Sequence, residues 1–149
     1  KDLGSRFLTN IQFIFNVENK LILLQNLLLQ NLKKKKTSLV FCENQSELRS
    51  LSENLWVNSR VNFLPHMVDE PYKNEMIILS DDKIDLMDDT LINFSDSMID
   101  GFNRYLKLIE LVTDDDETKE KARNRFKFYN DCGYKLNSVD AKQLSANLI

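Results

Sequence analysis

The stretch Ile11–Cys42, IQFIFNVENKLILLQNLLLQNLKKKKTSLVFC, carries the pattern that decides the fold. Its first residues, Ile11–Asn16, form a short apolar run that is typical of a buried strand. Over Asn16–Lys36 leucines recur at helical spacing, and the segment ends on lysines, which suit the negative end of a helix dipole. Thr37–Cys42 returns to a strand pattern. This order of strand, helix and strand predicts parallel pairing through a right-handed crossover.

The rest of the chain continues the alternation. Apolar residues at helical spacing predict a second helix over Asn44–Asn58, whereas Val61–Pro71 is interrupted by proline and indicates a loop or edge segment. Further strands are predicted at Met76–Ser80, Thr90–Phe94 and Tyr105–Val112, the last because its residues alternate with period two until its end. Further helices are predicted at Ser95–Asn103, Asp114–Asp131 and Ser138–Leu148. We therefore expect a single α/β domain over residues 1–149, with three layers, a mostly parallel sheet and helices on both faces.

Composition narrows the classes of function. The chain has 149 residues, 42% of them hydrophobic, a net charge of −3 and a pI of about 5.2. This acidic balance opposes binding of a DNA backbone as the main activity, so we expect no direct contact with nucleic acid. No apolar run is long enough to span a bilayer, and the start of the sequence lacks the pattern of a signal peptide. We expect a cytoplasmic protein without membrane contact.

Chemistry-bearing motifs are sparse. No GxGxxG follows the first strand and no GxxxxGK[ST] occurs in the chain, so the fold is expected to resemble nucleotide-binding proteins without their phosphate loop. Cys42 and Cys132 lie far apart, and with one histidine they do not make a zinc site. His66 has apolar neighbours, which favours packing or contact over catalysis. We predict no catalytic residue, metal or cofactor, and an inert buried Cys42.

Two acidic clusters invite a metal-site interpretation. The run Asp114–Glu117 opens a predicted helix, where carboxylates cap free N–H groups and suit the dipole, and this capping is the favoured interpretation. The aspartates between 81 and 89 do not have the spacing of a calcium loop, so they indicate a solvated turn.

The helix predicted over Asp114–Asp131 is the one dense basic segment of this acidic chain. Lys119, Arg123 and Lys127 recur every four residues and therefore share a face. Lys121 and Arg125 add positive charge on an adjoining strip. The aromatic residues among them are Phe126, Phe128 and Tyr129. This face suits a carboxylate, a phosphate or a peptide tail with acidic and aromatic groups. The alternative is a solvated helix face whose aromatic residues fill the core.

Three stretches together resemble the chi subunit of bacterial DNA polymerase III holoenzyme. Leu55 and Trp56, followed by Asn62–His66 (NFLPH), are similar to the family's LW…FxPH segment. Lys119–Tyr129 (KEKARNRFKFY) is similar to its K-x-x-A-R-x-R-[YF]-K-x-Y helix, and Gly133–Asn137 (GYKLN) to its G-[FY]-x-L-N. The order and spacing of the three also match. The chain then continues through Ser138–Ile149, past the point where the family's members end.

The resemblance implies a non-catalytic accessory subunit of the clamp-loader assembly with two binding surfaces. One surface takes the acidic C-terminal tail of single-stranded DNA-binding protein, which ends in a phenylalanine with a free carboxylate. Its pocket carries over onto Val112, Lys119, Arg123, Phe126 and Gly133. The other surface binds a small partner subunit, psi. It carries over onto Trp56, Phe63, Leu64, Pro65 and His66.

Two other classes of function stay open from the residues alone. One is a nucleotide-binding or hydrolytic enzyme on a similar α/β fold, because a fold does not exclude a function. The other is a direct single-stranded DNA binder that uses the basic helix and Lys33–Lys36, although a solubilising helix end is the more ordinary explanation for those lysines.

Overall fold

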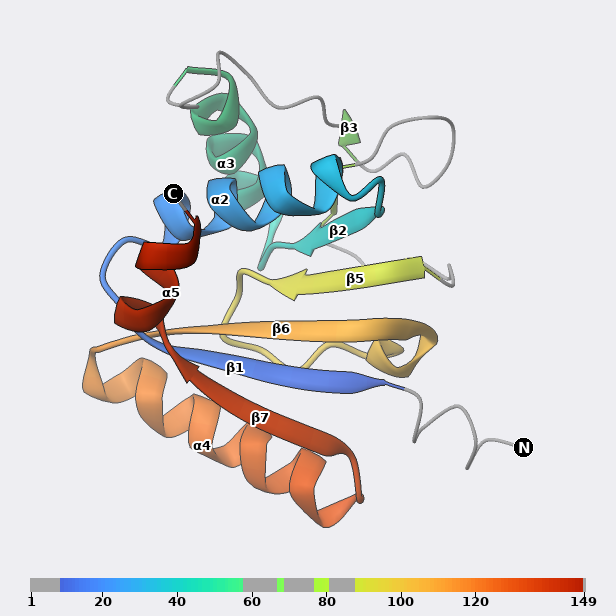
Figure 1. Ribbon diagram of the computed structural model, residues 1–149, viewed down its shortest axis with the longest axis vertical. Helices are drawn as coiled ribbons and strands as arrows, with labels where there is room; N and C mark the ends of the chain where they lie inside the picture. Colours follow the sequence, from blue (N-terminus) through green and yellow to red (C-terminus); the bar gives the residue numbers. More distant parts are fainter. Residues whose placement is uncertain (1–8, 58–66, 69–76, 81–87, 149) are drawn as a thin grey trace.

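The computed structural model describes residues 9–57, 67–68, 77–80 and 88–148. Strands and helices alternate over residues 10–57 and 102–148, and the described residues between these ranges form strands (Figure 1). Helices and the short 3-10 turn η1 occupy α2 (Lys20–Lys33), α3 (Gln45–Val57), η1 (Phe102–Arg104), α4 (Asp116–Asp131) and α5 (Ala141–Leu148). Strands occupy β1 (Asn10–Val17), β2 (Ser38–Phe41), β3 (Met67–Val68), β4 (Ile77–Ser80), β5 (Asp88–Asn93), β6 (Tyr105–Thr113) and β7 (Lys135–Asp140).

The strands form one seven-stranded sheet in the order β3-β4-β2-β5-β6-β1-β7. Each of its neighbouring pairs is parallel. The chain moves toward the β3 edge after β1 and after β2, and toward the β7 edge after β6. Because parallel crossovers are right-handed, movements in opposite directions place their helices on opposite faces of the sheet.

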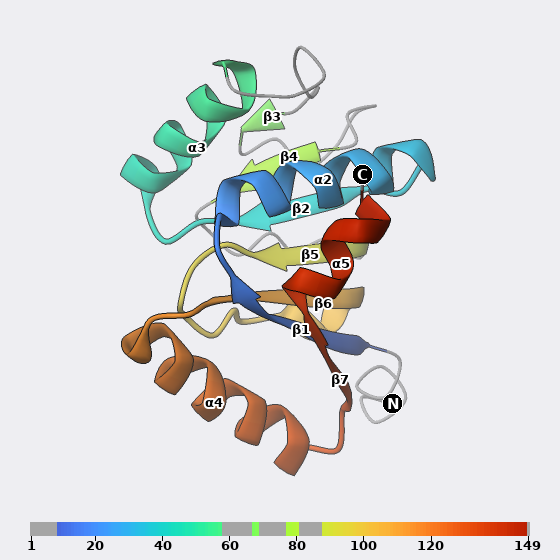
Figure 2. The same cartoon turned by 60° about the vertical axis from the view of Figure 1, so that its left-hand side comes forward.

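Two apolar cores confirm the predicted three layers. Ile14, Val40 and Ile92 project from one face of the sheet into a core with leucines of α2 and α3. Phe13 and Leu91, which alternate with two of these residues along the strands, belong to the second core, with α4 and η1. Figure 2 shows α2 and α4 on opposite sides of the sheet. Among the described helices, none combines the length and apolar character needed to cross a bilayer.

Helix α2 is shorter at both ends than the predicted range of Asn16–Lys36. Strand β1 continues through Val17, with Asn16 at a φ of 61° where the register shifts. Asn19 then caps the helix, because its side chain accepts a hydrogen bond from the Ile22 backbone N–H. At the other end Lys35 has a φ of 58°, which takes the chain out of the helix inside the lysine run.

Three sequence-based expectations need correction. Ser95–Asn103 is not a short helix apart from the η1 turn, because the Asn93 side chain accepts hydrogen bonds from the backbone and hydroxyl of Ser95 and bends the chain there. Strand β7 was not expected, and a helix follows it only from Ala141. Strand β6 does not alternate between buried and exposed residues, because from Leu108 to Val112 both faces of the sheet are covered.

Several other predicted elements are confirmed. The expected strands at Met76–Ser80 and Thr90–Phe94 correspond to β4 and β5. The described part of Val61–Pro71 is β3, which is the edge strand next to β4. Neither Cys42 nor Cys132 forms a disulfide within the described residues, and Cys42 is buried as expected.

Gly133 ends α4, as its position predicted. Its φ is 91°, its N–H donates to the Asn130 carbonyl, and the Tyr134 N–H donates to the Tyr129 carbonyl. This pair of hydrogen bonds is a Schellman motif, in which the left-handed residue is normally glycine because it has no Cβ. The motif directs the chain from α4 into β7.

We expect Gly133→Ala to lower the free energy of unfolding by roughly 1 kcal/mol, because alanine is disfavoured at positive φ. Gly133→Asn is the control, since asparagine tolerates this conformation better, and it should lose less. Urea unfolding curves of the three proteins measure both effects. Equal losses for alanine and asparagine would show that the backbone conformation is not what matters here.

Candidate functional site

A pocket of about 190 Å³ lies between α4 and the sheet. Its walls come from three consecutive elements, β6, α4 and β7, and from β1, which lies about ninety residues earlier in the sequence than β6. The lining residues are Phe13, Phe15, Val112, Lys119, Ala122, Arg123, Phe126 and Ser138. The pocket thus combines aromatic and aliphatic side chains with two cations.

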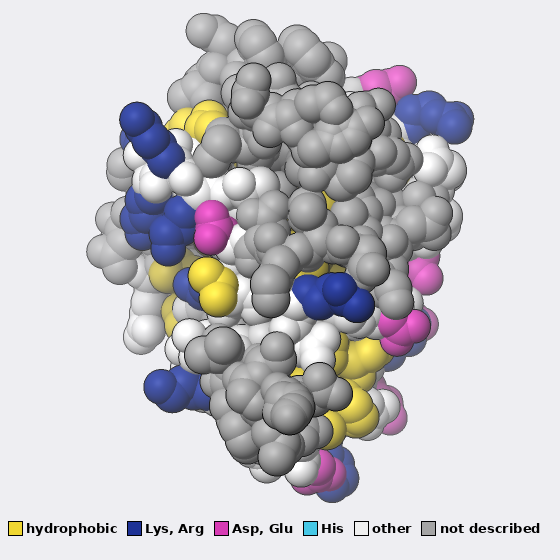
Figure 3. Space-filling view, turned by 90° about the vertical axis from the view of Figure 1, so that its right-hand side faces the viewer, with side chains coloured by type: hydrophobic (Ala, Val, Ile, Leu, Met, Phe, Trp, Pro, Cys, Tyr) yellow, Lys and Arg dark blue, Asp and Glu magenta, His cyan; other side chains and the backbone are white. Residues whose placement is uncertain are grey.

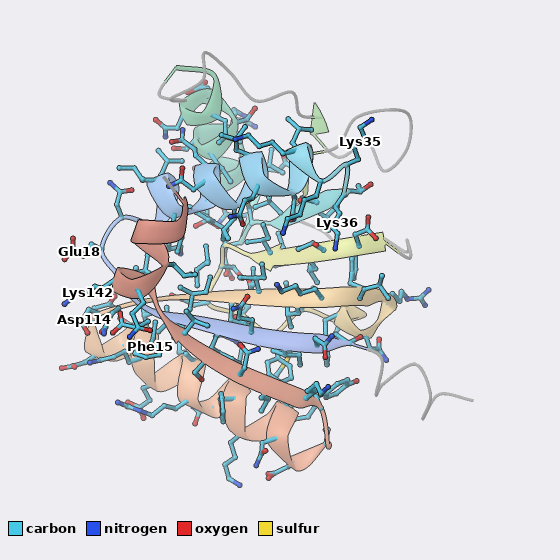
Figure 4. All side chains as sticks on the ribbon, in the orientation of Figure 1. Phe15, Glu18, Lys35, Lys36, Asp114 and Lys142 are labelled. Carbon is cyan, nitrogen blue, oxygen red and sulfur yellow. The ribbon has the colours of Figure 1, made fainter. Side chains whose placement is uncertain are left out.

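The sheet supplies an apolar floor. Phe13 and Phe15 are two residues apart on β1 and therefore project from the same face. Ser138 is the register partner of Phe13 on β7, so it shares this face. Phe13 and Val112 are buried, whereas Phe15 is 37% exposed at the rim. Figure 4 shows Phe15 and Asp114 at the end of the sheet where α4 begins.

Helix α4 supplies the cationic wall. Lys119, Ala122, Arg123 and Phe126 have the spacing of three and four residues that puts side chains on one helical stripe. The Phe126 ring packs against Phe13, with ring centroids 5.2 Å apart and planes inclined by 60°. Ala122 has only a methyl group, which leaves space between the helix and the floor.

The two cations differ in their surroundings. The Lys119 ammonium pairs with Asp114 across 3.2 Å. The exposed Arg123 guanidinium has no ion pair with any carboxylate of the described residues. Arg123 is therefore the cation at this pocket that an incoming anion reaches without displacing an internal partner.

The N-terminus of α4 is capped by Asp115, which confirms the capping interpretation of the acidic run. The Asp115 carboxylate accepts hydrogen bonds from the Thr118 backbone and the Thr113 hydroxyl. These two hydrogen bonds lower the pKa of Asp115 well below its usual value. The cap determines the residue at which α4 begins, and therefore the position of Lys119 along the helix relative to the sheet.

Arg125 is not part of a basic surface strip, contrary to the sequence-based expectation. It is 4% exposed, and its guanidinium meets the fully buried Glu110 of β6, with Nη2 3.0 Å and Nε 3.2 Å from Oε1. Lys121 and Lys127 do lie on the surface, where they pair with Glu117 and Asp131 of the same helix. A helical sequence pattern does not reveal which charged side chain faces a buried partner.

Glu110 is the centre of a buried network. Besides Arg125, it accepts hydrogen bonds from the Tyr129 hydroxyl at 2.8 Å and the Asn93 side-chain amide at 3.0 Å. Burial raises the pKa of Glu110, and Arg125 opposes the rise. Burial and the Glu110 charge raise the pKa of Tyr129, which keeps its hydroxyl protonated as a donor. Two residues of α4 are thus tied to one residue of β6.

Four of the five predicted tail-pocket residues meet in this pocket: Val112, Lys119, Arg123 and Phe126. Gly133 lies outside its lining, at the far end of α4. The sequence reasoning missed Phe13, Phe15, Ala122 and Ser138. The two phenylalanines at alternate positions of a strand were visible in the sequence, but nothing there indicated that β1 lies under α4.

The second predicted surface falls largely outside the described residues. Phe63, Leu64, Pro65 and His66 all belong to the range 58–66, which the structure does not describe. Trp56 lies within α3, but its side chain is also outside the described part.

Two comparisons with known proteins indicate the same family. The family model described as "DNA polymerase III chi subunit, HolC" matches residues 8–137, which include every lining residue of the pocket except Ser138. A curated relative, DNA polymerase III subunit chi of Escherichia coli (strain K12), is 26% identical over 111 residues. That match covers 72% of this chain and 76% of the relative.

Removing one partner of the buried Glu110–Arg125 pair should cost more stability than removing one partner of a surface pair on the same helix. We expect Arg125→Ala to lower the free energy of unfolding by roughly 3–5 kcal/mol, because it leaves a buried carboxylate without its partner. Lys121→Ala removes a pair from the surface of the same helix and should cost less than about 1 kcal/mol. Chemical unfolding measures both variants.

A double variant, Glu110→Gln with Arg125→Met, tests the cause. It removes both charges, so it should be less destabilised than Arg125→Ala. A double variant that is no more stable than Arg125→Ala would mean that lost packing, and not the unpaired charge, explains the loss.

Proposed function

The chain belongs to the DNA polymerase III chi subunit family, an accessory subunit family of DNA replication, and on this premise we propose that its α4 pocket binds a peptide tail. The tail is the acidic C-terminus of single-stranded DNA-binding protein, which ends in phenylalanine with a free carboxylate. The protein acts in the cytoplasm as an adaptor without catalysis of its own. One observation carries the proposal: an apolar slot lies beside Arg123, which pairs with no carboxylate in the part of the chain that the structure describes.

The slot suits an aromatic end group. Its volume of about 190 Å³ is several times the ~30 Å³ that one water occupies in the liquid. Phe13, Val112 and Phe126 present apolar surface to it. The rings of Phe13 and Phe126 are already inclined to one another, and a third ring can join such a tilted cluster with edge-to-face contacts.

Arg123 suits the free carboxylate at the end of the tail. A guanidinium can hold both carboxylate oxygens with two parallel hydrogen bonds, which an ammonium cannot do. Because no internal carboxylate occupies Arg123 in the described part of the chain, the fork is open to a ligand. A phosphate would satisfy the arginine as well, but it would leave the phenylalanine-lined slot empty.

Lys119 suits the acidic side chains that precede the terminal residue. It lies one helical turn before Arg123, and both line the pocket. Its ion pair with Asp114 is exposed and is therefore exchanged for a ligand carboxylate at small cost. The exposed Asp116 and Glu117 near the start of α4 repel an acidic tail, so binding is expected to be moderate.

The second surface of the proposal binds a psi-like partner subunit through Trp56, Phe63, Leu64, Pro65 and His66. Its support is the sequence resemblance together with the family membership. Co-purification with a psi-like subunit, compared between the unaltered chain and Trp56→Ala, tests this surface independently of the pocket.

We expect Arg123→Ala to weaken binding of a tail peptide by about 1–3 kcal/mol, the range for a charge-assisted hydrogen bond. Lys121→Ala is the matched control, because it removes one charge from the same helix outside the pocket. Isothermal titration of both variants with the same peptide gives the difference. Equal affinities for the two variants would remove Arg123 from the mechanism.

A tail peptide that lacks its terminal phenylalanine should bind hardly at all, because it loses the slot contacts and moves the carboxylate away from Arg123. Titration of the full and shortened peptides against the unaltered protein measures this. Superimposable curves would contradict the pocket as the tail site. Binding of the full peptide should also weaken with added salt.

A further inference from the structure

A polar strip crosses the sheet on the face opposite the α4 pocket. Near the beginnings of the strands, Thr90 of β5, Lys107 of β6 and Asn10 of β1 are partners in the pairing register. Lys135 of β7 is the next partner of Asn10. Register partners project from the same face of a sheet. One step further along the strands, Gln12 continues the polar strip on β1.

Apart from Lys135, the residues of this strip form the floor of a groove between α2 and α5. Its volume is about 340 Å³, and its walls include Gln30 and Asn31 from the last turns of α2 and Leu144 from α5. Figure 2 shows α2 and α5 next to each other over this face of the sheet. Four side-chain amides, those of Asn10, Gln12, Gln30 and Asn31, thus line one groove.

Three lysines also line the groove: Lys34, Lys36 and Lys107. Figure 4 shows Lys36 near the start of β5, while Lys35 points away from the sheet. Figure 3 views the molecule from the side where β1, β5 and β6 begin. Lysine and arginine side chains, drawn in dark blue, gather along one flank of this side. Within the described residues, none of the three ammonium groups has an ion pair with a carboxylate.

The lysines influence one another. Neighbouring side chains partly desolvate the Lys107 ammonium, and Lys34 and Lys36 add positive charge, so the pKa of Lys107 is lowered from its usual value. The groove also contains the Asp89 carboxylate, which accepts a hydrogen bond from the Thr37 backbone N–H. The helix dipole accounts for lysines at the end of α2, but not for Lys107 on a neighbouring strand.

We propose that this groove binds the phosphodiester backbone of single-stranded DNA. Ammonium and amide groups donate hydrogen bonds to phosphate oxygens, and a bound phosphate relieves the repulsion among the three lysines. None of the described side chains that line the groove is aromatic, so we expect contact with the backbone and not with stacked bases. The described lining has no arginine to hold a carboxylate with two parallel hydrogen bonds, and its apolar residues are aliphatic, so it suits an acidic peptide with an aromatic end less well than the α4 pocket does.

The proposal goes beyond tail binding, since the groove and the α4 pocket lie on opposite faces of the sheet. It also differs from what the composition suggested. A net charge of −3 disfavours DNA binding by the chain as a whole, but the groove gathers its lysines at one place. A polymerase subunit family works close to DNA strands, which makes a backbone contact of modest affinity useful.

The test uses fluorescence anisotropy with a short labelled oligothymidylate and no other protein. For three phosphate contacts, the slope of log affinity against log salt is expected to be about −2. Lys34→Gln with Lys107→Gln should reduce the slope to about −0.7 and weaken binding on the order of ten- to a hundredfold at low salt. Lys36→Glu alone provides a second variant in an exposed position.

Lys33→Gln with Lys35→Gln is the matched control. It removes the same charge from the same lysine run, but neither residue lines the groove, so its loss should stay within about threefold. Melting curves and titrations with the tail peptide should be unchanged in all these variants. A normal tail affinity together with lost DNA binding separates this inference from the proposed function.

Three results would overturn the inference. The first is an unaltered protein that does not bind the oligonucleotide at low salt. The second is an equal loss of oligonucleotide affinity in the Lys34/Lys107 and Lys33/Lys35 variants, which would indicate attraction to the positive charge of the whole lysine run and not to the groove. The third is polyglutamate of the same charge binding as tightly with the same slope, which would indicate an acidic peptide as the ligand.

Discussion

The attachment of α4 to the sheet depends on one buried contact, between the Glu110 carboxylate and the Arg125 guanidinium. An α-helix advances about 100° per residue, so the inward direction of Arg125 determines where every other side chain of α4 points. Ala122 and Tyr129 share its buried side, while Arg123 and Phe126 lie at the edge that borders the pocket. A rotation of the helix by one residue would remove Arg123 from the phenylalanine floor. The pair therefore sets the geometry of the pocket without touching its contents.

Such a buried ion pair determines the orientation of the helix more than it stabilises the fold. Taking both charges out of water costs several kcal/mol per ion, and the attraction between them recovers this only when the remaining hydrogen bonds are made. Here Tyr129 and Asn93 complete the hydrogen bonding of Glu110. An apolar contact at the same place would contribute as much stability, but it has no preferred direction and would permit more than one orientation of the helix. The charged contact has one geometry, which gives the helix one position.

Local patterns predicted what depends on local chemistry. The stripe of Lys119, Arg123 and Phe126, the cap at the start of α4 and the stop at Gly133 follow from helix periodicity and from the free N–H and C=O groups at helix ends. Arg125 was misassigned because its partner Glu110 lies in a strand 15 residues earlier, and no short-range rule links them. Strand β7 was missed because Lys135–Asp140 has few apolar residues and gains its order by pairing with β1. Phe13 and Ser138 enter the pocket through that same pairing.

Strand β1 serves both sides of the sheet with successive residues. Gln12 faces the polar groove and Phe13 faces the apolar pocket, so the two surfaces are interleaved along one stretch of backbone. The alternation makes the strand intolerant of changes in length. One inserted residue before Gln12 would exchange the amide and the ring between the two faces of the sheet. Because β1 is paired with β6 on one side and with β7 on the other, the strand cannot shift to accommodate the insertion. Over this strand, evolution can alter either surface by substitution, while insertions and deletions would damage both at once.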